Sequence, residues 1–190
     1  MDILTDDLIS LRALTPAPLM NGNDTYYLGL TSGAKLIAVG VNPEVCEILA
    51  YRWQTQTVGA DAAKELRSRR SRDAMADAQA VALKMQPLAV LWVVAPTAMT
   101  PLLLLPDGSL IGVSTSLAAA LHIVYGVPLV VDKASFEAAG VGLDEPQWCP
   151  QDLFRYYVKT ALNGLTELEF DTSLPPQVAA FFKSVAGGEG

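Results

Sequence analysis

The sequence predicts an α/β fold, with a single mixed or mostly parallel sheet covered by helices and a small irregular and helical C-terminal extension. Three observations support this class. Apolar residues make up 51% of the 190 residues and charged residues only 17%, which supplies a large core. Strand-length runs alternate with helix-length runs along the chain. Several strand-length runs are apolar at every position, which is typical of strands buried on both faces.

The N-terminal segments predict a helix and then a hairpin. Residues 2–14 place leucines at near-helical spacing, which predicts a short amphipathic helix. Residues 24–30 and 34–41 are two short apolar runs separated by Thr31-Ser32-Gly33. Two such runs around a short glycine-containing turn indicate a β-hairpin.

Two helices are expected after the hairpin. Asn42-Pro43-Glu44 is typical of a helix start, because Asn caps the helix, Pro fits its first position and Glu favours the positive end of the helix dipole. We expect this helix to end between Gln54 and Gly59. Residues 61–85 favour helix throughout, and Pro87 ends that helix.

Four strands and one more helix are predicted next. Residues 87–96 form a continuous apolar run of strand length, and residues 102–114 predict two strands around a Pro-Asp-Gly turn. Residues 115–125 predict a capped helix that stops at Gly126. Residues 127–132 predict a further buried strand.

The composition changes after Asp132, and we place a domain boundary there. Residues 1–132 are predicted to form the α/β core, and residues 133–190 a C-terminal extension that packs on it. The extension begins as irregular chain, rich in Gly and Pro. It ends in a short helix predicted over residues 173–185.

The uncharged stretch Pro87–Pro106 is long enough to raise a membrane hairpin as an alternative. Pro96 and Pro101 interrupt it, and the Asp107-Gly108 turn is too short to cross a headgroup layer twice. We therefore predict buried strands and no membrane span. The acidic N-terminus is unlike a signal peptide and the chain has only two cysteines, which together predict a cytoplasmic location.

Local sequence motifs of catalysis are absent. Neither the phosphate-binding patterns GxxxxGK[ST] and GxGxxG nor the nucleophile pattern GxSxG occurs. The single histidine and two cysteines cannot complete a zinc site, so no metal site and no cofactor are predicted. Glu44 and Glu47 lie one helical turn apart, but acids at a helix start usually serve the helix dipole. An enzyme would need a site assembled from dispersed residues, and the candidates are Asp24, Glu44, His122 and Asp132.

A basic run is the strongest local charge feature of a chain whose net charge is −7. It lies on the helix predicted over residues 61–85. Two interpretations stay open: the run contacts nucleic-acid phosphates against the repulsion of an acidic body, or it is a solvated helix face paired with Glu65, Asp73 and Asp77. The candidate nucleic-acid-binding residues are Lys64, Arg67, Arg69, Arg70 and Arg72.

Two segments show a pattern known from a protein family. In residues 21–41, NGNDTYYLGLTSGAKLIAVGV, Asp24 opens a strand and a Gly-containing turn leads to the next strand. Residues 74–122 contain a helix with a Gln, an apolar strand and a short strand that leads into a helix. In this order they resemble the nuclease-related (NERD) domains of the restriction-nuclease-like fold. Ala38-Val39-Gly40 stands where that family has its acid-x-Lys pair, so the resemblance implies a degenerate site that does not hydrolyse phosphodiesters.

Three functions remain open from the sequence. The first is a non-catalytic α/β domain that binds a protein partner or assembles as a homo-oligomer, because so many apolar residues leave apolar surface for an interface. The second is a nucleic-acid-associated protein with a degenerate nuclease-like fold, and the third is an enzyme with a dispersed site. Aromatic side chains anchor interfaces, and Trp148, Tyr156 and Tyr157 are the interface candidates.

Overall fold

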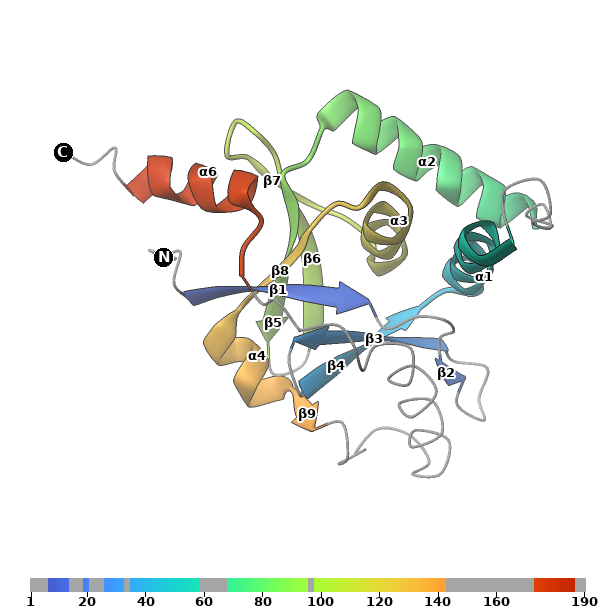
Figure 1. Cartoon of the computed structure of the whole chain (residues 1–190), viewed down its shortest axis with the longest axis horizontal. Coiled ribbons are helices and arrows are strands. Elements are labelled where there is room, and N and C mark those ends of the chain that lie inside the picture. Colours follow the sequence, from blue (N-terminus) through green and yellow to red (C-terminus); the bar gives the residue numbers. More distant parts are fainter. Residues whose placement is uncertain are drawn as a thin grey trace.

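A computed structural model shows a nine-stranded mixed sheet with helices packed against it (Figure 1). The predicted α/β class is confirmed. The structure describes residues 7–13, 19–20, 26–32, 35–58, 68–95, 98–142 and 173–186. The strands are β1 (Leu8–Ala13), β2 (Leu19–Met20), β3 (Tyr26–Ser32), β4 (Lys35–Val41), β5 (Ala89–Ala95), β6 (Ala98–Leu104), β7 (Leu110–Gly112), β8 (Leu129–Asp132) and β9 (Val141–Gly142). The helices are α1 (Pro43–Val58), α2 (Arg69–Met85), α3 (Thr115–Tyr125), α4 (Lys133–Ala139) and α6 (Pro176–Ala186).

The sheet runs in the order β7-β6-β5-β8-β1-β3-β4-β9, and β2 pairs with β3. Among the described pairs, β5 with β8 is parallel and the others are antiparallel. A parallel neighbour needs a crossover, and α3 supplies it between the β5-β6-β7 meander and β8. The sheet is therefore mixed and mainly antiparallel, so the mostly parallel alternative is wrong.

Strand β5 is covered on both faces over residues 89–92, whereas Val93 further along the strand is 44% exposed. Val90 and Trp92 belong to a core cluster that includes residues of α1, α2 and α3. Ala89 and Leu91 point the other way and pack with Val178 of α6. Trp92 is 2% exposed, which makes it a core residue. Successive strand residues alternate between faces, so two covered faces remove the polar alternation.

The helix predicted over residues 2–14 is wrong, because residues 8–13 form strand β1. Leu8 pairs with Asp132 of β8 on one side, and Arg12 pairs with Thr31 of β3 on the other. Leu8 packs on the α6 face of the sheet and Leu11 on the opposite face. The near-helical leucine spacing thus comes from a central strand with two buried faces.

The hairpin and the three following helices agree with the sequence. Strands β3 and β4 pair antiparallel from Tyr26↔Val41 to Ser32↔Lys35. Helix α1 starts at Pro43 and ends at Val58 as predicted. Helix α2 is described from Arg69 onward, so residues 61–67 of the predicted helix lie outside the described residues. Helix α3 is capped by the Ser114 hydroxyl and stops at Gly126, whose φ is +67°.

The region after Asp132 is more regular than predicted. The Asp132 carboxylate accepts a hydrogen bond from Ser135 N–H at 2.7 Å and caps α4, which replaces the expected irregular chain. Phe136 of α4 is fully buried, and β9 joins the same sheet beside β4. The predicted C-terminal helix is confirmed as α6. The boundary at residue 132 stays a prediction.

Candidate functional site

Glu47 of α1 holds the start of α2. Its carboxylate accepts hydrogen bonds from Ser68 N–H at 3.1 Å and from the Ser71 hydroxyl at 2.5 Å. Ser71 is fully buried. The first N–H groups of a helix lack partners within the helix, so a carboxylate from a neighbouring helix caps them well. Glu47 is therefore committed to the α1–α2 junction.

Glu44 lies one turn earlier on α1 and faces the same junction. Its Oε1 is 4.0 Å from a guanidinium nitrogen of Arg70, and its buried Oε2 has no hydrogen-bond partner among the described residues. The nearby Cys46 thiol is half-buried. Burial, and to a lesser extent the nearby Glu44 charge, raise the pKa of Cys46 to about 11. The thiol is protonated at neutral pH and is a poor nucleophile.

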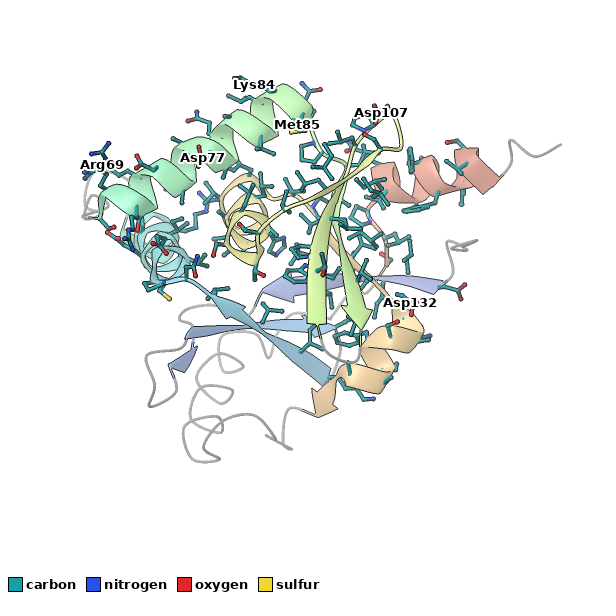
Figure 2. The ribbon with its side chains drawn as sticks, turned by 180° about the vertical axis from the view of Figure 1, so that it is seen from behind. Arg69, Asp77, Lys84, Met85, Asp107 and Asp132 are labelled. Atoms are coloured by element: carbon teal, nitrogen blue, oxygen red, sulfur yellow. The ribbon has the colours of Figure 1, made fainter. Side chains whose placement is uncertain are left out.

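The basic run projects into solvent at the start of α2, and Figure 2 shows Arg69 at that end of the helix. The side chains of Arg69 and Arg70 are 87% and 85% exposed. Arg69 lies 3.7 Å from Asp73, one turn along the helix, which is one of the ion pairs expected from the sequence. Lys64 and Arg67 lie outside the described residues. Arg69 and Arg70 therefore already lie near the carboxylates of Asp73 and Glu44.

His122 lines the first of two adjoining hollows at the C-terminal end of α3. Its Nδ1 is 2.9 Å from the Val127 carbonyl oxygen. The hollows have volumes of about 290 and 420 Å³ and share Gly126 and Pro128. Among the described residues, those that line them include no Asp, Glu, Lys or Arg. These hollows offer apolar contacts and hydrogen bonds without fixed charge. Their polar lining residues are Ser10, Gln86, His122, Tyr125, Ser173 and Gln177.

The candidate residues for a dispersed catalytic site have separate contacts in different elements. Asp132 caps α4, Glu44 faces Arg70, and His122 bonds a carbonyl at the end of α3. Asp24 lies outside the described residues. Within the described part of the chain, no group of three or more His, Cys, Asp or Glu side chains is placed to hold a metal ion.

Strand β7 forms one end of the sheet and is exposed along its whole length. Leu110 is 51% and Ile111 38% exposed, and Gly112 is exposed as well. On its inner side β7 pairs with β6 from Leu104↔Leu110 to Leu102↔Gly112. No described strand lies on its outer side. In Figure 2, Asp107 marks the turn of this hairpin. Strand β7 is thus an uncharged, apolar and unpaired edge of the described sheet.

Neither a protein-family model nor a curated protein matches this chain. The resemblance to NERD domains therefore stays a prediction. None of the described helices is long and apolar enough to cross a membrane.

The interface residues named from the sequence and those found in the structure differ. Trp148, Tyr156 and Tyr157 lie outside the described residues. The exposed edge at Leu110 was not singled out from the sequence, although its strand was predicted. A signal was present, because residues 109–131 contain no Asp, Glu, Lys or Arg. An edge strand within such a segment lacks the charges that usually protect edges.

Proposed function

We propose that the chain is a non-catalytic protein-binding domain that accepts a strand from its partner along the outer side of β7. The main support is the exposure of Leu110 and Ile111 on an edge strand that has no charge and no proline. Natural sheets usually protect such edges with lysine, proline or a covering segment. An edge without these features favours strand addition, in which main-chain hydrogen bonds supply affinity.

The backbone of β7 is oriented for this interaction. Val113 N–H donates to the Pro101 carbonyl, and Leu105 N–H donates to the Ser109 carbonyl. Hydrogen-bonded pairs recur every second residue along an antiparallel ladder. The pair Leu103↔Ile111 lies two residues from each of these bonded pairs, so Ile111 bonds inward to β6. The N–H and C=O groups of Leu110 and Gly112 consequently point outward, where a partner strand can bond them.

The two alternative functions have less support. Arg69 and Arg70 face Asp73 and Glu44, so nucleic-acid phosphates would have to compete with carboxylates already in place. The carboxylates of Glu47 and Asp132 cap helices, so both have structural roles. Among the described residues, neither the basic run nor the dispersed acids form a site as open to a partner as the outer side of β7.

Photo-crosslinking in the cells that make the protein tests this proposal. A photo-crosslinking amino acid in place of Leu110 is expected to give discrete products with protein, and the second substitution Gly112→Pro is expected to abolish them because it removes an outward N–H. The same amino acid at Val185, which is 58% exposed on α6, is the matched control. Products that are identical at both positions, or that persist with Gly112→Pro, would overturn the proposal.

A further inference from the structure

Resting on the proposed function, we infer that the strand added at β7 is β7 of a second copy of this chain. The two copies pair antiparallel about a two-fold axis through Ile111. Such a contact is self-complementary, since each residue meets its counterpart in reverse order. The nine-stranded sheet then continues from one copy into the other.

The register follows from the outward groups. Leu110 of one copy bonds Gly112 of the other, and Gly112 bonds the partner's Leu110, which makes four main-chain hydrogen bonds. Ile111 then lies opposite the partner's Ile111 as a non-hydrogen-bonded pair with Cα atoms about 4.5 Å apart. This register uses every outward N–H and C=O group of β7 in both copies.

The side chains fit the same register. Leu110 and Gly112 share one face of the strand, so each leucine lies opposite a glycine of the other copy. Folding of a single copy does not require this glycine, because Gly112 has no positive φ and an added Cβ would lie 3.9 Å from Leu102 Cδ2, an ordinary contact.

Charge favours this place of contact between two copies. Each copy carries a net charge of −7, so contacts through most surfaces bring like charges together. The segment from Ser109 to Val131 has no Asp, Glu, Lys or Arg, and β7 lies within it. An edge-to-edge contact at Ile111 therefore adds little like-charge repulsion.

Cysteine crosslinking of the full chain tests the register. With oxidised glutathione as the oxidant, Ile111→Cys is expected to form a covalent dimer, because the paired Cα atoms are within disulfide reach. Leu110→Cys is the matched control, since its Cα lies about 8–9 Å from the same atom of the other copy, which is too far. The unsubstituted chain under the same conditions reports on the native cysteines. Crosslinking that is equal at both positions would overturn the inferred register.

Sedimentation over an about hundredfold concentration range tests the assembly itself. The unsubstituted chain is expected to show a monomer–dimer equilibrium. Gly112→Pro is expected to raise the dissociation constant about tenfold or more, and Gly112→Ala, which keeps the N–H, is expected to leave it within about threefold. Leu110→Lys is a second disrupting variant that leaves the backbone N–H in place.

The outcomes separate this inference from the function on which it rests. A chain that sediments as a monomer at every concentration, or a dimer that Gly112→Pro and Leu110→Lys leave unchanged, would overturn the inference. If Leu110 photo-crosslinks to a different protein in a Gly112-dependent manner, the protein-binding function stands and the second copy is wrong. If no edge-dependent product forms, both are wrong.

Discussion

Removing the Glu47 carboxylate should strongly destabilise the protein, although Glu47 lies far along the chain from the groups it binds. Its carboxylate caps α2 through Ser68 N–H and the Ser71 hydroxyl. In Glu47→Ala both donors lose this acceptor, and Ser71 is too buried for water to replace it. The substitution therefore breaks two bonds to a charged group and leaves a buried hydroxyl unpaired.

The expected loss follows from these two bonds. A hydrogen bond to a charged group contributes about 1.5–3 kcal/mol, and loss of a helix cap costs about 1 kcal/mol. We expect Glu47→Ala to lower the free energy of unfolding by about 3 kcal/mol. Glu47→Gln keeps two hydrogen-bonding atoms and should lose about half as much. Urea denaturation followed by circular dichroism measures both values.

A double-mutant cycle isolates the bond to Ser71. In a background of Ser71→Ala, Glu47→Ala should cost about 1–2 kcal/mol less than it does alone, because no buried hydroxyl is left unpaired. Asp73→Ala is the surface control and should change stability by about 0.5 kcal/mol or less, since its pair with Arg69 is exposed. Additive effects of the two substitutions, or a Glu47→Ala loss as small as that of Asp73→Ala, would refute the capping role.

Three further predictions concern single residues. Gln86 ends α2 with φ of +45°, a left-handed conformation that glycine adopts without strain. Gln86→Gly should therefore raise the free energy of unfolding by about 1 kcal/mol and the melting temperature by about 2–4 °C in calorimetry. A lower melting temperature would contradict this. Burial raises the pKa of Cys46 to about 11. In a Cys149→Ser background, its alkylation by iodoacetamide should therefore be slow at neutral pH and accelerate up to that pKa, whereas the rate for an exposed thiol levels off near about pH 8.5. Hydrogen bonds from the Ser109 hydroxyl and N–H lower the pKa of Asp107. The stabilisation by these bonds is present above the ordinary pKa of an aspartate and is lost as the pH falls through the lowered pKa of Asp107. Ser109→Ala should raise the pKa of Asp107 in an NMR titration.

Elements with local signals were predictable from the sequence. The start of α1 is encoded by Asn42-Pro43-Glu44, and the end of α3 by Gly126 in its left-handed conformation. Strand β1 was mistaken for a helix because its leucines serve two faces of the sheet, which depends on neighbours far away in the chain. Helix α4 was missed because it is short, and its cap at Asp132 directly ends a strand.

The candidate surface was only partly predictable for a similar reason. The sequence predicted a strand at residues 110–112, and it showed that the surrounding segment has no charge. Whether a strand lies at an edge is decided by strand order, and β7 is at the end because β8 takes the place next to β5. Likewise, the partner of Glu47 is a serine on the following helix, a contact that no local spacing encodes.

The central position of β1 affects how the chain folds as it leaves the ribosome. Leu8 leaves the ribosome well before its partner Asp132, whereas the β3–β4 hairpin closes over a few residues. One edge of β1 therefore stays unpaired until residues 129–132 of β8 have been synthesised. Such long-range pairing slows folding and exposes an apolar strand during the delay. A nascent chain stalled before residue 129 retains the hairpin and α1 but lacks the strand that joins the two halves of the sheet.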